Sequence, residues 1–288
     1  MKALLLVAVI LASSAALGLQ SEPDSSLPTA QSGYLGFDRN DYPGDSNLKS
    51  LRQTFSYSGY WLNNPPGAKI NSWTGKRKTL QAAGFGFLVL FNGRTYADIK
   101  HAGDAAKLGN SDAVAAVAAA RAEGFPAQTI IFLDQEQGGR LLPEQRDYLH
   151  AWVDGVSAAQ FGAGVYCSGI AAKEGSGASI VTAEDIRKNA GGRKIKYWVV
   201  NDSCPPSPGC TVSRKDLSPQ SSGIAFAEVW QFSQSPRTDF ARGCPANYNK
   251  DGNCYAPGMV PAKDPAQRLA VDLDVAAASD PSHGRTRD

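Results

Sequence analysis

Eight short apolar runs recur along this chain, and their spacing limits what it can fold into. Each run is rich in β-branched or aromatic residues, which is typical of buried strands. The runs are Tyr34 to Asp38, Tyr57 to Leu62, Phe87 to Phe91, Ile130 to Asp134, Ala163 to Cys167, Lys196 to Val200, Ala225 to Phe232 and Leu269 to Val275. Amphipathic stretches separate most of them, so the pattern predicts a protein of the α/β class.

Several of the connecting stretches have the apolar spacing of helices. They are Ser46 to Phe55, Gly75 to Ala83, Asp112 to Glu123, Pro143 to Ala159 and Thr182 to Asn189. The last two connections, Ser203 to Gly223 and Ser233 to Gln267, are instead rich in Pro, Ser, Gly or Asn. This order predicts a single (β/α)8 TIM-type barrel with irregular last connections. A doubly wound open sheet is the alternative, although no G-x-G-x-x-G motif follows the first strand.

The barrel is expected to occupy residues 33–279. Residues 1–18 contain a lysine, an apolar run and then small residues, which is the pattern of a secretory signal peptide. A polar linker over residues 19–32 and a polar tail over residues 280–288 would flank the domain. No later run of about 20 apolar residues predicts a membrane span, so we expect a secreted or periplasmic protein.

Composition excludes several classes of function. The formal net charge is only +2 and the sequence has no basic run, so neither nucleic acid nor a membrane surface is an expected partner. The three histidines are scattered, which does not favour a zinc site or another metal centre, and no cofactor is expected. The sequence also lacks the G-x-S-x-G motif of serine hydrolases.

The five cysteines are compatible with secretion. Their proximity in the sequence suggests one disulfide between Cys204 and Cys210 and another between Cys244 and Cys254. Cys167 is left over within an apolar run, and we expect it to be a buried, unreactive thiol.

Two acidic residues stand at the end of the fourth apolar run, as Asp134-Gln135-Glu136. Because side chains alternate along a strand, Asp134 and Glu136 are expected to point the same way, about 6.5 Å apart along the backbone. At the mouth of a barrel such a pair can act as acid and base on a glycosidic bond, since one carboxyl can stay protonated while the other is charged. A solvent-exposed acidic turn is the simpler interpretation of an isolated D-x-E.

Further acids lie at other expected strand ends. Asp38 ends the first strand, Asp202 follows the sixth, and Asp272 and Asp274 lie in the eighth. The C-terminal ends of the strands surround the active site of a (β/α)8 barrel, so these acids are expected to converge there. Acids are costly inside a barrel, and their convergence therefore indicates either function or a satisfied polar network.

Six segments occur in a specific order: Gly36 to Gly44, Phe132 to Glu136, Gly164 to Tyr166, Tyr197 to Val200, Val229 to Ser233 and Val271 to Asp274. In this order they resemble the strand motifs of the family 25 glycoside hydrolase muramidases, and still more those of related secreted glycoside-hydrolase-like domains. Two segments depart from the muramidase pattern. Arg39-Asn40 follows Asp38 where the muramidases carry a Ser two positions after the Asp, and the last motif is D-L-D instead of D-x-N.

The resemblance implies roles for four acids. Glu136 matches the general acid/base, and Asp134 matches its partner carboxylate. Asp38 and Asp202 would complete the acidic floor of the site. The sequence leaves open whether a carboxylate, a water or an acetamido group of the substrate is the nucleophile.

Residues near these acids are expected to bind the substrate. They are Trp61, Tyr166, Trp198, Trp230, Gln231, Asp272 and Asp274. The aromatic members can stack on sugar rings, although aromatic residues also pack in protein cores. We therefore expect a secreted glycoside hydrolase that acts on a cell-wall or related polysaccharide, with peptidoglycan favoured. The alternative is a catalytically inactive barrel that binds glycans or serves as an interaction protein of the cell envelope.

Overall fold

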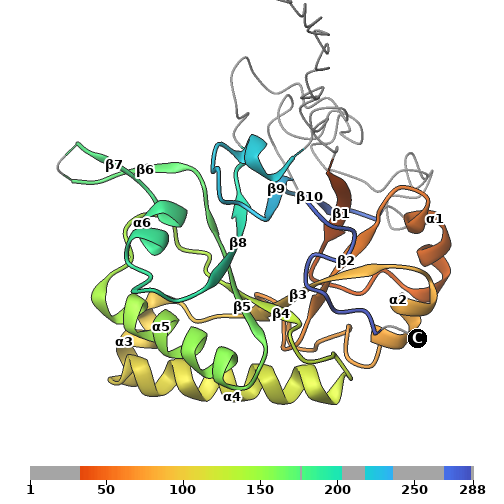
Figure 1. The fold of residues 1–288 in the computed structure, drawn as a ribbon, viewed down its shortest axis with the longest axis horizontal. Coiled ribbons are helices and arrows are strands. Elements are labelled where there is room, and N and C mark those ends of the chain that lie inside the picture. Colours follow the sequence, from red (N-terminus) through yellow and green to blue (C-terminus); the bar gives the residue numbers. More distant parts are fainter. Residues whose placement is uncertain (1–32, 176, 203–217, 236–268, 287–288) are drawn as a thin grey trace, which may run out of the picture. The chain divides into compact units, whose positions relative to one another are not determined.

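Eight strands form a closed barrel in the computed structural model, which describes residues 33–175, 177–202, 218–235 and 269–286 (Figure 1). Each strand corresponds to one of the expected apolar runs, so the predicted barrel is confirmed. The strands are β1 (Tyr34–Asp38), β2 (Tyr57–Trp61), β3 (Gly86–Asn92), β4 (Ile130–Asp134), β5 (Gly162–Ser168), β8 (Ile195–Val200), β9 (Val229–Ser233) and β10 (Asp272–Ala276). Around the barrel the order is β1, β10, β9, β8, β5, β4, β3 and β2.

The direction of the last strand differs from a barrel of eight parallel strands. Neighbouring pairs from β1 through β9 are parallel, but β10 is antiparallel to both β1 and β9. Asp272, the first residue of β10, therefore pairs with Asp38, the last residue of β1. The apolar pattern could not predict this reversal, because a strand has the same alternation in either direction. As a result, β10 begins at the end of the barrel where the other strands finish.

Helices surround the barrel, mostly at the positions expected. They are α1 (Leu48–Arg52), α2 (Arg77–Ala82), α3 (Tyr96–Ala102), α4 (Ala105–Ala122), α5 (Pro143–Ala158) and α6 (Thr182–Lys188), with short 3-10 turns η1 (Asp45–Asn47) and η2 (Pro219–Ser222). The sequence reasoning missed α3, although Thr95 and Asp98 form a capping box at its start. It also missed the hairpin of β6 (Ala171–Lys173) and β7 (Ser179–Val181), which extends away from the barrel in Figure 1.

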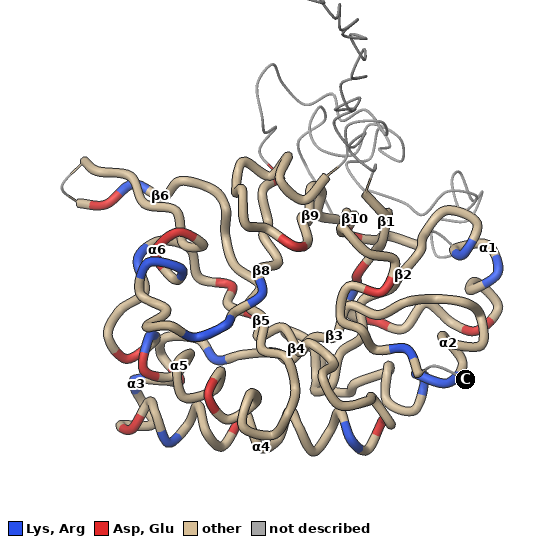
Figure 2. Tube along the Cα trace, in the orientation of Figure 1, with Lys and Arg blue, Asp and Glu red and all other residues tan. Residues whose placement is uncertain are grey.

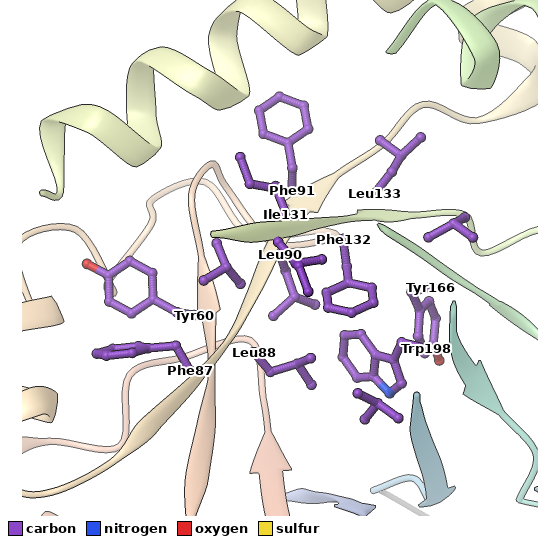
Figure 3. Packing of buried hydrophobic residues seen from close by; sticks show 14 of the residues in the cluster. Tyr60, Phe87, Leu88, Leu90, Phe91, Ile131, Phe132, Leu133, Tyr166 and Trp198 are labelled. Carbon is purple, nitrogen blue, oxygen red and sulfur yellow. The ribbon is translucent and has the colours of Figure 1, made fainter. Parts of the chain in front are cut away.

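The barrel interior is packed with large side chains. Figure 3 shows Leu88, Leu90 and Phe132 pointing toward Trp198 and Tyr166. The rings of Phe132 and Trp198 have centroids 6.1 Å apart, and those of Tyr166 and Trp198 are 4.6 Å apart. Since side chains alternate along β4, the inward direction of Phe132 also turns Asp134 toward the interior.

The outer layer depends on a close contact between α4 and α5. A Cβ at Gly109 in α4 would lie 2.3 Å from the carbonyl oxygen of Tyr148 in α5. A Cβ at Gly155 in α5 would lie 2.7 Å from the Cβ of Ala113 in α4. The two helices therefore approach more closely than side chains at these positions would allow.

We expect Gly109→Ala to destabilise the protein by about 2 kcal/mol, because the new methyl would force α4 and α5 apart. Helix propensity alone predicts the opposite sign, with alanine favoured by about 1 kcal/mol. Urea denaturation would measure the effect, with Ser111→Ala on the exposed face of α4 as the control. A Gly109→Ala protein as stable as the wild type would contradict the close packing of these helices.

Residues 280–286 belong to the expected polar tail, yet they are bonded to the barrel. The Asp280 Oδ1 accepts a hydrogen bond from the Phe87 amide at 2.8 Å. Ser282 is fully buried, and its Oγ accepts from the Val89 amide at 2.8 Å. The Arg77 guanidinium donates to the carbonyl oxygen of Gly284 at 2.7 Å. This segment therefore belongs to the folded domain, at the end of the barrel where β3 and β4 begin.

Some expectations fall on parts of the chain that the structure does not describe. The signal peptide over residues 1–18, the linker over residues 19–32 and the cysteines of both suggested disulfides lie outside the described residues. Cys167 is buried and free, as expected, and burial raises the pKa of its thiol. None of the described helices is long and apolar enough to cross a membrane.

Candidate active site

A cavity of about 340 Å³ lies at the barrel end where β1 and β4 finish. Figure 2 shows acidic residues at several of the strands around the barrel. Of the residues expected at the site, the cavity is lined by Asp38, Trp61, Asp134, Glu136, Tyr166, Trp198, Gln231 and Asp272. Asp202, Trp230 and Asp274 do not line it. The barrel therefore brings most of these residues together from strands far apart in the sequence.

Asp134 and Glu136 lie on the same cavity at different depths. β4 ends at Asp134, so Glu136 belongs to the loop that follows, where it is exposed. Asp134 is only 5 % exposed, and neither of its carboxyl oxygens has a hydrogen-bond partner among the residues placed in the structure. Burial raises the pKa of Glu136. The pKa of Asp134 lies well above its usual range because of burial and the nearby charges of Glu136 and Asp38.

A chain of side chains orients Asp38. The Gln231 Nε2 donates to the Asp38 Oδ2 at 2.8 Å, and the Tyr166 hydroxyl donates to the Gln231 Oε1 at 2.8 Å. Gln234 in turn donates to the Tyr166 hydroxyl oxygen at 3.2 Å. Burial raises the pKa of Asp38 to about 6, against the opposing effect of its hydrogen bonds to Asp274 and Gln231. Gln231 therefore holds an acid in place, using both ends of its amide.

Asp274 lies beneath Asp38 and is fully buried. The Trp198 indole donates to the Asp274 Oδ1 at 3.1 Å. Its Oδ2 has no donor among the described residues. Two carboxyls can bond to each other only through a proton, which one of them must carry. Burial and the charge of Asp38 raise the pKa of Asp274 well above its usual range. The protonated form of Asp274 is thus the favoured one, and, contrary to expectation, Asp274 does not line the cavity.

Asp272 lines the cavity, and Asp202 does not. Asp272 lines the cavity, where its carboxylate accepts a hydrogen bond from the Ser235 amide. Burial, together with the charges of Asp38 and Asp202, raises the pKa of Asp272 well above its usual range. Asp202 follows β8 and is close enough to act on Asp272, but it does not line the cavity as the expected acidic floor would require.

Trp230 packs outside the cavity. Its indole donates to the Asn201 carbonyl oxygen at 2.9 Å, and its ring centroid lies 5.5 Å from that of Phe232. Because neighbouring residues of a strand point to opposite faces, the inward direction of Gln231 requires Trp230 to point outward. The aromatic residues that do line the cavity are Trp61, Tyr166 and Trp198.

The cavity also contains residues that the sequence reasoning did not place there. They include Arg39, Asp41, Gln234 and Ser235. Adjacency to Asp38 was the only sequence signal for Arg39. In the described part of the chain, no group of three or more His, Cys, Asp or Glu residues is arranged to hold a metal ion.

Comparisons with solved structures show relatives of low identity. An uncharacterized B. stearothermophilus protein is 15% identical with a TM-score of 0.51, over 85% of this chain and 96% of that one. The Mycobacterium tuberculosis Tat-secreted protein Rv2525c in complex with L-tartrate is 14% identical with a TM-score of 0.49, over 86% and 97%. The bacterial lysozyme from Streptomyces coelicolor is 14% identical with a TM-score of 0.47, over 88% and 97%. The first of these likenesses supports the fold alone.

The family is shown by the sequence itself. No curated protein matches the chain significantly. The sequence model of the family described as "Rv2525c-like, glycoside hydrolase-like domain" matches residues 60–203, which are 144 of the 288 residues. The matched region contains β4 with Asp134 and the loop with Glu136. The expected resemblance is therefore confirmed, and the chain belongs to the Rv2525c-like family of glycoside hydrolase-like domains.

Proposed function

We propose that this protein is a secreted or periplasmic glycoside hydrolase that cuts a cell-wall polysaccharide by carboxylate acid/base catalysis, with peptidoglycan as the favoured substrate. The observation that carries the proposal is the pair Asp134 and Glu136. Both acids line one cavity and both have raised pKa values, and Trp61 and Trp198 line the same cavity. Paired carboxyls with raised pKa values beside aromatic walls are the equipment for cutting a glycosidic bond.

Glu136 is the general acid in this proposal. It is exposed beside the cavity, so the oxygen that leaves the cut bond can reach it. A raised pKa keeps its carboxyl protonated closer to neutral pH, which is what proton donation to a leaving group requires.

Asp134 is the deeper partner. In the free protein burial favours its neutral form, but both of its oxygens lack donors from the described residues. A hydroxyl or amide of the bound glycan can donate to these oxygens, and such a bond favours the charged carboxylate. The proton shared by the coupled pair then moves toward Glu136, and Asp134 stabilises positive charge on the sugar.

One observation favours the second candidate, a barrel that binds glycans without cutting them. Burial raises the pKa of Asp134 and so favours its neutral form in the free protein, which makes catalysis by the pair depend on a ligand that donates to Asp134. A barrel whose ligands lack that donor would bind and not react.

Digestion of peptidoglycan distinguishes the two candidates. We expect the mature protein to release new reducing ends from peptidoglycan, while the double variant Asp134→Asn/Glu136→Gln releases none. The same preparations are sedimented with insoluble peptidoglycan to measure binding. Wild-type protein that binds the polymer yet releases no reducing ends would refute the hydrolase and support the glycan-binding barrel.

A further inference from the structure

Arg39 is the only cationic side chain among the described residues that line the cavity. Its guanidinium forms neither a hydrogen bond nor an ion pair in the described structure. The Nε atom is buried and still has no partner. Buried donors in proteins are almost always satisfied, and a guanidinium has five of them. An unsatisfied arginine at a cavity therefore needs a physical explanation.

The position of Arg39 is held by its backbone. The Trp61 indole donates to the carbonyl oxygen of Arg39 at 3.1 Å. The Trp73 indole donates to the carbonyl oxygen of Asn40 at 2.8 Å, and the Asn40 side chain donates to the carbonyl oxygen of Pro66 at 3.1 Å. These bonds fix the main chain at the edge of the cavity, and the Arg39 side chain lines the cavity from that position.

The nearby acids do not neutralise Arg39 through direct contact. Burial lowers the pKa of Arg39, and the nearby charges of Asp41 and Asp272 oppose that shift, but neither acid forms an ion pair with it. Burial also raises the pKa of Asp272, which favours the neutral form of that acid. The positive charge of Arg39 thus remains available to a ligand in the cavity.

We propose that Arg39 binds a carboxylate carried by the glycan, so that the protein prefers strands whose sugars have a free carboxylate over strands in which it is masked as an amide. This inference rests on the proposed function, because it places the glycan in the cavity. A guanidinium matches a planar carboxylate through two parallel hydrogen bonds. A carboxylate also brings a single negative charge, which suits a cavity with several acids better than a phosphate monoester with about −1.5 to −2.

In peptidoglycan this preference selects a particular form of the polymer. The lactyl carboxylate of a muramic acid residue is free where the peptide stem has been removed and is an amide where the stem is attached. Arg39 therefore makes strands without peptide the better ligand.

Binding of two matched fragments tests the proposal. The first is a peptide-free peptidoglycan oligosaccharide with free lactyl carboxylates, and the second is the same oligosaccharide after its carboxylates are converted to amides. Calorimetry with the Glu136→Gln protein measures both affinities without turnover. We expect amidation to weaken binding about ten- to a hundred-fold, as loss of charge-assisted hydrogen bonds does.

Variants assign the preference to Arg39. Adding Arg39→Ala should make the two fragments bind equally. Adding Arg39→Lys keeps the charge but removes the two parallel hydrogen bonds, so it should retain only part of the preference. This variant also tests the role of Arg39 if the alanine variant does not fold. Lys69→Ala is the matched control, because it removes an exposed positive charge that does not line the cavity. It should leave the preference unchanged.

Equal affinity for the two fragments, tighter binding of the amide, or no binding of either fragment would overturn the role of Arg39. The reducing-end assay is independent of these outcomes. Release of reducing ends without a carboxylate preference removes the inference and leaves the proposed hydrolase. A preference that depends on Arg39, in a protein that releases no reducing ends, removes the hydrolase and retains a carboxylate-selective glycan site.

Discussion

Glu136→Gln should lower the rate of glycan cleavage by about a hundred- to ten-thousand-fold, the usual contribution of a general acid. Glutamine has nearly the same shape as glutamate but cannot supply a proton to the leaving oxygen. Glu136 is exposed at the cavity and lies beyond the end of β4, so the substitution should not disturb the barrel. Initial rates of reducing-end release from peptidoglycan measure the effect, and sedimentation should show that the variant still binds the polymer.

The pH profile separates loss of the acid from general damage. In the wild type, the rate should fall as the pH rises above the pKa that the Asp134 and Glu136 pair shows as a unit, because the donor is then deprotonated. The residual activity of Glu136→Gln should lack this decline. Glu184→Gln, at an exposed position in the first turn of α6, is the control and should behave like the wild type. A Glu136→Gln protein with full activity would assign the acid to another residue.

Side-chain alternation explains which site residues could be predicted from sequence. It turns Asp134 toward the barrel interior together with Phe132, because it depends only on the backbone of β4. Glu136 lines the same cavity as expected, but from the loop after β4, where strand alternation no longer applies. The same rule forbids Trp230 and Gln231 from both facing the cavity. Only Gln231 does so, and the choice between them depends on the register of β9 against β8 and β10.

The roles of Asp272 and Asp274 depended on strand direction, which alternation does not encode. In a parallel strand the later residue, Asp274, would lie nearer the mouth. Because β10 runs the other way, Asp272 faces the cavity and Asp274 lies opposite Gly36, deeper in the barrel. The burial of Asp274 beneath Asp38 follows from this cross-strand register and could not be predicted from the sequence.

The place of Arg39 at the cavity could not be predicted from the sequence for a different reason. Its neighbour Asp38 was expected at the site, but a residue next to a strand end can point either way. Hydrogen bonds from Trp61 and Trp73 fix the backbone at Arg39 and Asn40, and they join segments more than twenty residues apart. Contacts of that kind depend on the completed fold and leave no local pattern.

The buried acids should make the protein less stable as the pH rises from about 4 to about 6 and beyond, which is opposite to ordinary acid denaturation. The pKa of Asp38 is raised by burial from 3.8 to about 6 in the folded protein. Between these values the folded state keeps a proton that the unfolded state has released, so deprotonation favours unfolding. Asp38 alone should cost about 3 kcal/mol by the end of this range. Asp134, Asp272 and Asp274 act in the same direction, because burial raises the pKa of each.

Asp274→Asn isolates this effect from the acids on the surface. Asp45, Asp98 and Glu174, which lie outside the cluster, have lowered pKa values through hydrogen bonds, so they act in the opposite direction in both proteins and cancel in the difference. The asparagine amide can donate to Asp38 in place of the carboxyl proton of Asp274, and one titrating group is lost. The free energy of unfolding in urea, measured from about pH 4 to about pH 8, should therefore fall less steeply in Asp274→Asn than in the wild type.

Asp147→Asn, at an exposed position of α5 outside the cluster, is the matched control and should keep the wild-type slope. Stability of Asp274→Asn that follows the wild-type curve at every pH would mean that Asp274 does not hold a proton in the folded state. If the slope changes as expected, the acidic cluster lowers the stability of the fold near neutral pH. Packing then gives no reason for these acids to be there, and binding or reaction of a ligand in the cavity becomes the physical account of their presence.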